Sequence, residues 1–326
     1  MNTLKRAMSS SISSDLWLIG AGQMAQDYVQ VLKALQTPFK VIGRGKNSAA
    51  AFESAMEIPV QTGGIEKALQ KEPPPETAFV AVGVEQLASV SSKLLQAGTK
   101  RILLEKPGGM NLKELQKLLL EAQSQHAKVW LAYNRRFYEA TRKAQEIIQE
   151  DGGVTSCHFE FTEWSHKIRE LEGKTDIKAV WLLANSTHVV DLAFHLCGWP
   201  SSWQSWSAGT LDWHPAAARF SGAGVTEQGV LFSYFADWEA PGRWGVEALT
   251  RNNRLILRPM EQLQLTPLGS LQVKPVNLDD KLDHDFKPGL YRQTEAFLNG
   301  DTVDFCTLQE QVEHTKLYSE MAGYCN

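Results

Sequence analysis

Short apolar runs alternate with amphipathic helical segments through the first 135 residues of the chain. Each run suits a buried β-strand, and the runs are Leu16–Ile19, Phe39–Ile42, Pro59–Thr62, Ala78–Val82, Ile102–Leu104 and Val129–Tyr133. Between the first two runs, Met24, Tyr28, Val31 and Leu32 fall at helical spacing on one face. Strands that alternate with helices in this way predict an α/β unit, a doubly wound parallel sheet with helices on both faces.

The pattern changes after residue 135, where strand-like segments dominate. They are Thr155–Thr162, Trp203–Ser207, Gly229–Phe235, Trp244–Leu249, Arg254–Leu257 and Gln262–Leu265, and several of them alternate apolar and polar residues. This alternation is typical of an antiparallel sheet with one solvated face. One helix interrupts the strands near Thr187–Leu196, and two more are predicted over Gly289–Leu298 and Leu308–Tyr324. We therefore predict an α+β unit on a large, open, mostly antiparallel sheet.

The change of pattern divides the chain into three parts. Residues 1–14 are rich in serine and predict a disordered lead-in, residues 15–135 form the first unit, and residues 136–326 form the second. The second unit carries a set of large aromatic residues that we expect on its exposed sheet face: Trp203, Trp206, Phe232, Phe235 and Trp238. Such an apolar surface is large for a monomer, so this sheet is predicted to form the interface of a homodimer or homotetramer.

Composition and charge narrow the class of protein. Of 326 residues, 43% are hydrophobic and 21% are charged, and the formal net charge of −4 gives no reason to expect a nucleic acid or a membrane surface as partner. No apolar run approaches the length needed to span a bilayer. The four cysteines form no C-x-x-C pair, which favours free thiols and a cytoplasmic location. Histidine and cysteine show no metal-ligand spacing, so no metal is expected.

The first strand leads into a glycine-rich turn, Gly20-Ala21-Gly22-Gln23-Met24-Ala25. In this G-x-G-x-x-A pattern, Gly20 permits a tight turn and Gly22 lets a pyrophosphate approach the backbone. Gln23 and Met24 begin the helix, whose N-terminus attracts phosphates. Strand, turn and helix together predict a dinucleotide site of the Rossmann type, bordered by Val82 and Gly83 at the end of the fourth strand.

The end of the second strand bears on the choice between NAD and NADP. An NAD-binding protein usually places an acidic residue here to hold the ribose 2′-hydroxyl. This chain instead reads Gly43-Arg44-Gly45-Lys46-Asn47-Ser48, in which Arg44 offers a planar guanidinium and Ser48 a hydroxyl. We therefore predict NADP, with NAD possible. The alternative is that Arg44 is a surface charge.

The fifth strand ends in Glu105-Lys106-Pro107, where a sheet of this kind binds ligands. With Gly20-Ala21-Gly22, the step Asn134-Arg135-Arg136-Phe137 and the later His188-x-x-Asp191, this motif resembles the glucose–fructose oxidoreductase, inositol dehydrogenase and MocA (Gfo/Idh/MocA) family over nearly the whole chain. The resemblance implies NAD(P)-dependent oxidation or reduction of a sugar, cyclitol or nucleotide sugar. It also implies a cis peptide bond before Pro107, and oligomers built through the open sheet.

Hydride transfer at a secondary alcohol needs a group that exchanges the hydroxyl proton. We predict that Lys106 and His188 do this, that Glu105 borders the cofactor, and that Asp191 either orients His188 or pairs with His195. Candidate substrate contacts are Arg135, Arg136, Lys167, Asn185 and Asp191. The chain departs from the family pattern at Ala184, where many members carry an aspartate. Two functions therefore stay open, a dehydrogenase or a non-catalytic nucleotide-binding sensor on the same fold.

Overall fold

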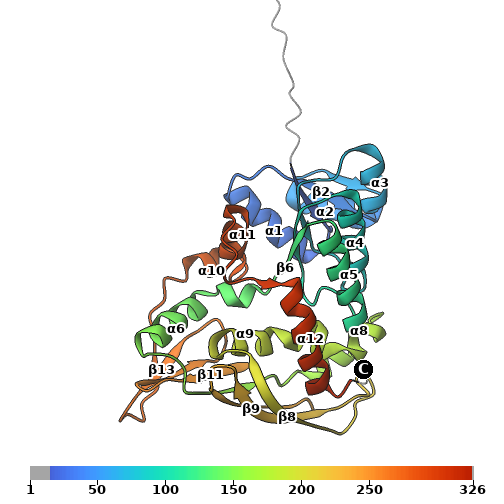
Figure 1. The fold of residues 1–326 in the computed structure, drawn as a ribbon. Coiled ribbons are helices and arrows are strands. Elements are labelled where there is room, and N and C mark those ends of the chain that lie inside the picture. The colour runs from blue at the N-terminus through green and yellow to red at the C-terminus, as the bar shows by residue number, and fades with distance from the viewer. Residues whose placement is uncertain (1–14, 325–326) are drawn as a thin grey trace, which may run out of the picture.

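A computed structural model of the chain describes residues 15–324 and contains two β-sheets that lie one above the other in Figure 1. The predicted lead-in, residues 1–14, lies outside the described residues. Helices α9 (Thr187–Cys197) and α12 (Leu308–Ala322) lie between the two sheets and separate them (Figure 1). In residues 15–324, no helix combines the length and the apolar character needed to cross a membrane.

The first sheet is the predicted doubly wound parallel sheet. Its strands follow the order β15-β6-β5-β4-β1-β2-β3, with β1 at Leu16–Ile19, β2 at Lys40–Gly43, β3 at Val60–Thr62, β4 at Thr77–Val80, β5 at Arg101–Leu104 and β6 at Lys128–Leu131. Strand β4 pairs in parallel with both β1 and β5, so these three strands end at the same edge of the sheet. The glycine turn and the Glu105–Pro107 step are therefore brought to one edge, as predicted.

Helices cover both faces of this sheet because apolar side chains project from both sides of its strands. One face packs against α1 (Gln23–Ala34), α2 (Lys46–Met56) and α11 (Leu290–Asn299). The other packs against α3 (Gly64–Lys71), α4 (Leu87–Ala97), α5 (Leu112–Ser124) and α12 (Leu308–Ala322). Helix α2 was not predicted, and its sequence, which is rich in alanine, carries few large apolar residues.

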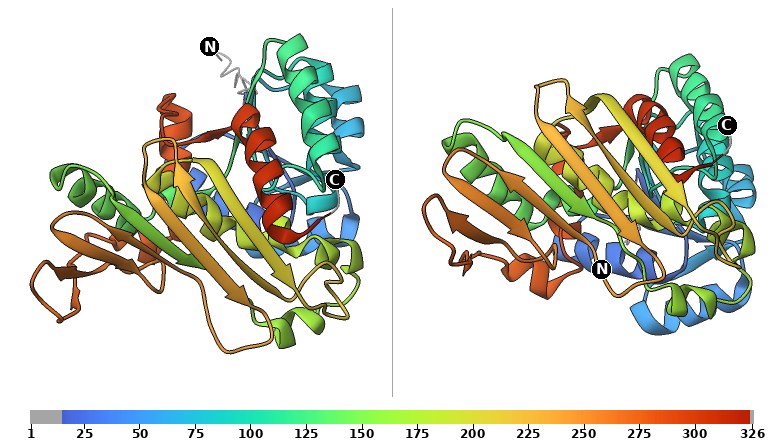
Figure 2. Two further views of the ribbon diagram at one scale, coloured as in Figure 1. Left: turned by 60° about the horizontal axis from the view of Figure 1, so that its bottom comes forward. Right: turned by 90° about the horizontal axis from the view of Figure 1, so that it is seen from below.

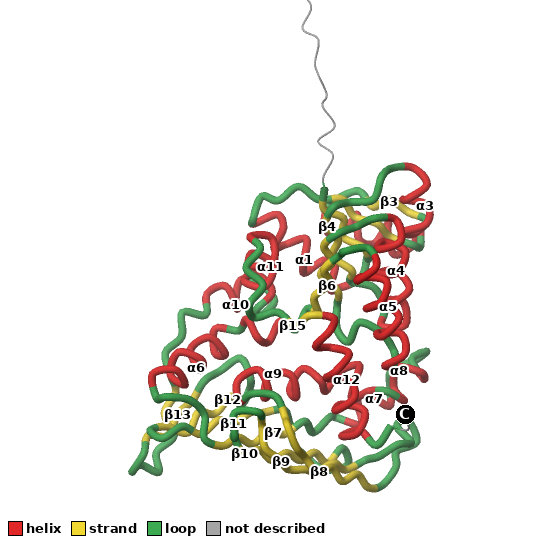
Figure 3. Tube along the Cα trace, in the orientation of Figure 1, coloured by secondary structure: helices red, strands yellow, loops and turns green. Residues whose placement is uncertain are grey.

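The C-terminal part of the chain returns to the first sheet. Strand β15 (Cys306–Thr307) pairs antiparallel with β6 and forms the edge of the sheet, as Figure 3 shows. On helix α11, the ring of Phe297 packs against the rings of Phe79 and Trp130, with centroids 5.4 Å and 5.5 Å away. The division of the chain at residue 135 stays a prediction, and these C-terminal residues add to the packing of its N-terminal part.

The second sheet is large, open and mostly antiparallel, as predicted. Its order is β14-β13-β12-β11-β7-β10-β9-β8, with β7 at Ser156–Glu160, β8 at Pro200–Ala208, β9 at Arg219–Thr226, β10 at Leu231–Asp237, β11 at Gly245–Leu249, β12 at Asn253–Leu257, β13 at Gln264–Pro267 and β14 at Lys274–Pro275. Only β7 and β10 pair in parallel among these described strands. Helices α6 (Glu139–Glu150) and α9 (Thr187–Cys197) cover the face that points to the first sheet.

The opposite face of the second sheet carries no helix from residues 15–324 (Figure 2). Trp206, Leu231 and Phe235 are exposed on it. The predicted set of exposed aromatics was partly wrong, because Phe232 and Trp238 are 3% and 1% exposed and pack against the helical layer. Alternation along β10 explains the error, since Phe232 and Phe235 are an odd number of positions apart and point to opposite faces.

Short segments complete the chain between the two sheets. They are the 3₁₀ turns η1 (Val84–Gln86) and η2 (Asn134–Phe137), the short helices α7 (Ser165–Arg169), α8 (Thr175–Ala179) and α10 (Lys281–Asp285), and the π-helical turn η3 (Leu182–Ser186). The turn η3 runs directly into α9 at Thr187. Single π turns of this kind occur often at functional sites, and η3 lies beside Lys106.

Candidate functional site

The glycine turn after β1 leaves room for a phosphate group. Gly20 has φ +135°, and a Cβ atom on it would lie 2.1 Å from the carbonyl oxygen of Ala81, so only glycine fits this turn. A Cβ atom on Gly22 would meet nothing within 4 Å among the described residues. Helix α1 begins next, at Gln23 and Met24, so its free N–H groups face this open space. The turn fits the pyrophosphate of a dinucleotide.

The end of β2 presents a second anion-binding arrangement. Gly45 is the N-cap of α2, and Ser48 lies in the first turn, where its hydroxyl donates to the Gly45 carbonyl oxygen at 3.1 Å. The Arg44 side chain is exposed beside this helix N-terminus. The first turn of α2 contains no acidic residue that would repel a phosphate. Arg44 and Ser48 therefore lie together at the N-terminus of α2, directly after β2, and their role in binding the cofactor stays a prediction.

Lys106 lies at the end of β5, and its peptide bond to Pro107 is cis, as the family resemblance implied. Its ammonium donates a hydrogen bond to the carbonyl oxygen of Ala184 in η3. Burial lowers the pKa of Lys106 to about 8, with Glu105 opposing and Arg135 adding to the effect. A lysine of this kind exchanges protons near neutral pH, which an ordinary surface lysine does not.

Glu105 points away from the cleft toward α1. The hydroxyl of Tyr28 donates to its Oε1 at 2.9 Å. Burial raises the pKa of Glu105, while the Lys106 charge and the Tyr28 hydrogen bond act in the opposite direction. The carboxylate is thus held close to Lys106 and keeps the pKa of that amine higher than burial alone would.

His188 is the second residue of helix α9 and lies near enough to Lys106 to be affected by its charge. Its ring lies edge-on to Tyr133, with centroids 6.0 Å apart, and 6.3 Å from the ring of Trp244. Burial lowers the pKa of His188 well below its usual value, and the charges of Arg135 and Lys106 add to this. His188 is therefore a neutral imidazole, and its Nδ1 atom has no hydrogen-bond partner in residues 15–324.

Arg136 and Asp191 bind each other and not the cleft. Arg136 Nε and one terminal nitrogen donate to the two Asp191 oxygens at 2.8 Å and 2.7 Å, and Asp191 is 0% exposed. The two roles predicted for Asp191 on α9 were therefore wrong, because its carboxylate is directed at this guanidinium. His195 instead contacts Gln145, with 3.0 Å between its Nε2 and the amide nitrogen. Because both partners are buried in this pair, we no longer propose Arg136 or Asp191 as substrate contacts.

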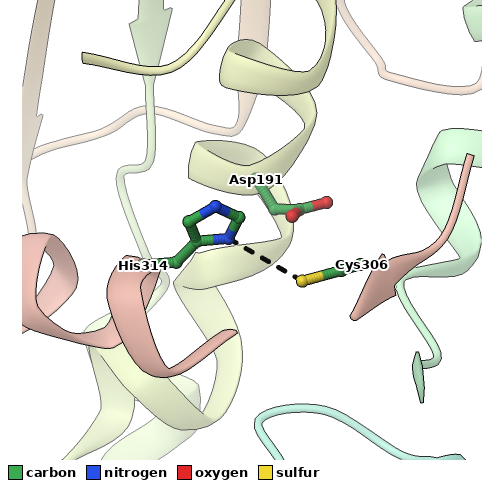
Figure 4. Close-up of side chains that lie close together, drawn as sticks. All are labelled: Asp191, Cys306 and His314. Carbon is green, nitrogen blue, oxygen red and sulfur yellow. Dashed lines mark hydrogen bonds between the residues drawn. The ribbon is translucent and has the colours of Figure 1, made fainter. Parts of the chain in front are cut away.

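Three side chains that are far apart in the sequence converge beside this ion pair (Figure 4). Asp191, Cys306 and His314 place one potential ligand atom each within 4.8 Å of one another, and all three are buried. Cys306 Sγ and His314 Nδ1 are 3.7 Å apart, the contact drawn in Figure 4. The Arg136 guanidinium already supplies the positive charge at Asp191. The expectation of no metal stays a prediction, and this cluster is explained by packing around the ion pair.

The remaining predicted contacts lie in different surroundings. Arg135 is half-buried, with its guanidinium 5.0 Å from the ring centroid of Trp244, and it acts electrostatically on both Lys106 and His188. Lys167 is exposed on α7. Asn185, on η3, donates to Glu163 at 3.0 Å. Arg135 and Asn185 are thus near Lys106, whereas Lys167 lies in the solvated segment that follows Trp164.

A cleft of about 710 Å³ opens between the two units at this point. Val82 and Gly83 line it from the end of β4, and Ala184 and Asn185 line it from η3. Its volume is within the range that small-molecule sites usually have. The end of β4 therefore borders the cleft, and the contact of Val82 and Gly83 with the cofactor stays a prediction.

Glu163 is a buried carboxylate at this site that the sequence reasoning missed. It follows β7 by three residues and is 4% exposed. Its Oε1 accepts hydrogen bonds from Ser186 Oγ at 2.7 Å and from Asn185 at 3.0 Å. In the sequence it stands in Thr162-Glu163-Trp164-Ser165, which reads as an ordinary strand end, so no local signal marks it.

A parallel sheet with a glycine turn after its first strand, and with a half-buried lysine at the same strand edge, is typical of dinucleotide-binding Rossmann folds. Residues 16–133 match the family model GFO_IDH_MocA, described as the oxidoreductase family with an NAD-binding Rossmann fold. The Rossmann part of this chain is therefore similar to the Gfo/Idh/MocA family, which agrees with the resemblance drawn from the motifs.

Curated relatives match the N-terminal half. Trans-1,2-dihydrobenzene-1,2-diol dehydrogenase of Mus musculus is 28% identical over 163 residues, which cover 49% of this chain and 48% of the relative. The enzyme of the same name from Homo sapiens is 27% identical over 137 residues, which cover 41% of this chain and 40% of the relative. The match thus spans about half the length of these relatives or less.

Solved structures resemble the whole fold. UDP-N-acetylglucosamine 3-dehydrogenase from Acidithiobacillus ferrooxidans has a TM-score of 0.73 at 15% identity, covering 95% of this chain and 97% of that one. Levoglucosan dehydrogenase in complex with NADH has a TM-score of 0.76 at 16% identity, covering 94% and 96%. At such identities these structures establish the fold of both units and leave the substrate open.

Proposed function

We propose that this chain is an NADP(H)-dependent oxidoreductase that transfers a hydride between the nicotinamide and a secondary alcohol or ketone. The observation that carries the proposal is Lys106, a half-buried lysine with a pKa of about 8 that is hydrogen-bonded to Ala184, a residue that lines the cleft. The substrate class we propose is a sugar, a cyclitol or a nucleotide-linked sugar. The names of the similar dehydrogenases support this class, as does the family of the Rossmann part.

The cofactor would be held by the two turns described above. Gly20, Gly22, Gln23 and Met24 would surround the pyrophosphate, and Arg44 with Ser48 would bind the 2′-phosphate. When bound, the nicotinamide supplies or accepts the hydride. In alcohol oxidation Lys106, as the neutral amine, accepts the hydroxyl proton, and neutral His188 holds the same oxygen through a hydrogen bond. In ketone reduction the Lys106 ammonium returns that proton.

Exchange of the charge at Arg44 is expected to reverse the cofactor preference. Arg44→Asp removes a charge-assisted hydrogen bond to the 2′-phosphate and places a carboxylate where NAD has a ribose hydroxyl. We expect the Kd for NADP to rise roughly ten- to hundredfold while NAD binds better. Isothermal titration of both nucleotides measures this. Lys46→Ala is the matched control, because Lys46 is an exposed cation on the same segment. Tighter binding of NAD than of NADP by the wild type would contradict the proposal.

Turnover is tested with a panel of sugars, cyclitols, nucleotide sugars and trans-dihydrodiols, with NADP and NAD, followed by nicotinamide absorbance. Oxidation of at least one group of alcohols, with NADP preferred, is the expected result. Nucleotide binding without turnover on the whole panel would favour the sensor instead. The position of Lys106 favours the enzyme, since a purely nucleotide-binding protein has no need of a lysine with a pKa of about 8 beside the cleft.

The exposed face of the second sheet supports a proposal of homodimers or homotetramers. Trp206 is 61% exposed and lies on the same uncovered face as Leu231 and Phe235 (Figure 2). Because an apolar patch of this kind is usually covered in solution, Trp206→Glu is expected to convert the oligomer to a monomer. Multi-angle light scattering at micromolar concentration measures the mass. Leu268→Glu is the control, since Leu268 is 81% exposed in the turn after β13. A monomeric wild type would refute the proposal.

A further inference from the structure

Glu163 is a buried carboxylate that lies between two clefts of the site. Its Oε1 accepts hydrogen bonds from Ser186 and Asn185, and its Oε2 lies 3.9 Å from an Arg243 nitrogen. Glu163 lines a second cleft, of about 590 Å³, on the side of Trp164. Asn185 lines the first cleft. A carboxylate with so little exposure is costly unless it is paired, so its retention here points to a role.

The turn η3 connects Glu163 to Lys106. The carbonyl oxygen of Ala184 accepts from the Lys106 ammonium, and the next two residues, Asn185 and Ser186, donate to Glu163. The two ionisable groups are therefore held by three consecutive residues of one turn. The Glu163 charge raises the pKa of Lys106, in the same direction as Glu105 and against the effect of burial.

The residue that bonds to Lys106 brings no charge of its own. The side chain of Ala184 is a methyl group that is 7% exposed, so only its backbone carbonyl contacts the Lys106 amine. A carbonyl fixes the position of an ammonium but stabilises its charge less than a carboxylate does. Among the charges that act on Lys106, Glu105 is turned toward Tyr28, which leaves Glu163 as the acidic group on the cleft side.

We propose that Glu163 is the positioning residue of Lys106. Its charge keeps the amine able to hold a proton near neutral pH, and its two hydrogen bonds fix the turn whose carbonyl holds that amine. Glu163 thereby takes the part that a carboxylate at position 184 would have. This inference rests on the proposed function in one respect, namely that Lys106 exchanges the substrate proton. The electrostatic link between Glu163 and Lys106 can be measured without any substrate.

Several other charges face this pair and set the sign of the expected change. The groups that act on Lys106, on Glu163 or on both are Glu105, Arg135, His188, Arg243 and Lys287. Arg135 and Lys287 lower the pKa of Lys106, and His188 is neutral, so these groups do not replace a lost negative charge. With Glu163 neutralised, Glu105 alone opposes burial, and the pKa of Lys106 has to fall.

The test measures the pKa of Lys106 directly in the full-length protein. Limiting acetic anhydride is applied across a range of pH, and acetylation of the Lys106 peptide is quantified by mass spectrometry, which follows the fraction of neutral amine. In the wild type the midpoint is expected at about 8. In Glu163→Gln it is expected to fall by roughly half a unit to one unit, because one nearby negative charge is gone.

Glu160→Gln is the matched control. Glu160 is also 4% exposed, ends strand β7 three residues before Glu163, and has its carboxylate paired with Arg258 at 2.8 Å. Its loss is expected to leave the Lys106 midpoint unchanged. Glu163→Ala is a second neutral variant, in case the glutamine variant does not fold, because its smaller side chain leaves room for water to accept the bonds of Asn185 and Ser186. Thermal unfolding by circular dichroism identifies which variants are folded.

An unchanged or raised Lys106 midpoint in a folded Glu163 variant overturns the inference, and so does an equal fall in Glu160→Gln. With a substrate in hand, the acid limb of the kcat profile for alcohol oxidation is expected to move to lower pH in Glu163→Gln by the same amount as the labelling midpoint. If the chain turns over no substrate, the proposed function fails, and the labelling experiment still decides the link between Glu163 and Lys106.

Discussion

Replacement of Lys106 by methionine is expected to lower kcat by about 10²–10⁴-fold, the usual contribution of a general acid–base group. Methionine has a similar length and no proton to exchange, so the loss falls on the chemical step. The Kd for NADP is expected to stay nearly unchanged, because the residues that we propose to bind its phosphates lie at the N-termini of α1 and α2 and in the turns before them. Steady-state kinetics on an established substrate and nucleotide titration measure the two effects separately.

The pH dependence gives this prediction a second readout. In alcohol oxidation Lys106 works as the neutral amine, whose fraction rises as the pH increases through its pKa of about 8. The wild-type kcat is therefore expected to rise across this range, and in Lys106→Met that limb should be absent. His188→Ala is the comparison variant and should cost less, since neutral His188 contributes a hydrogen bond and no charge. Near-wild-type turnover of Lys106→Met would show that the proton takes another route.

Loss of the Asp191 carboxylate is expected to destabilise the protein by about 3–5 kcal/mol, because Asp191→Asn leaves the Arg136 guanidinium buried without its counter-charge. Urea unfolding followed by tryptophan fluorescence measures the free energy of unfolding. Both hydrogen bonds of the pair are short and its members are inaccessible, so the surrounding water cannot compensate. If Asp191 instead bound substrate, Asp191→Asn would raise KM and leave the free energy of unfolding unchanged.

Two further variants distinguish the net stabilisation by the Arg136–Asp191 ion pair from the cost of leaving one buried charge without its partner. Glu247→Gln removes a partner from the exposed Arg254–Glu247 pair, 3.7 Å apart, and is expected to change the free energy of unfolding by less than about 1 kcal/mol. The double variant Arg136→Met with Asp191→Leu fills the same space with apolar atoms. It is expected to recover most of the loss, since replacing both members of a buried pair is often close to neutral.

The parts of the site that depend on local chemistry were predictable from the sequence. Gly20 marks the phosphate turn because only glycine tolerates its backbone angle, and Gly22 marks it because the space beside its Cα is open. Lys106 was found because it lies at the end of a buried strand, where sheets of this kind bind ligands, and because Glu105-Lys106-Pro107 resembles the family motif. In both cases the function of the segment is carried by residues that are adjacent in the chain, so a short motif contains the information.

The missed parts depend on contacts between distant segments. Strand β9 was not predicted because Gly222 and Gly224 lower its strand propensity, yet a Cβ atom on Gly222 would lie 2.4 Å from the ring of Tyr234, so glycine is required by the neighbouring strand. Asp191 was given a role at the site from its spacing with His188, although its partner Arg136 comes from a different segment. Glu163 was overlooked for the same reason, since its partners lie on η3.

The return of the chain to the first sheet has a consequence for how the protein folds during synthesis. Strand β6 has an unpaired edge until β15 has been made, and the rings of Phe79 and Trp130 lack their partner on α11 until Phe297 emerges. Arg101 also donates to the Phe297 carbonyl oxygen, a contact between residues 196 positions apart. Contacts of such long range form late and slowly. The first sheet, although most of its strands come early in the sequence, is therefore expected to complete its packing only after Phe297 and strand β15 have been synthesised.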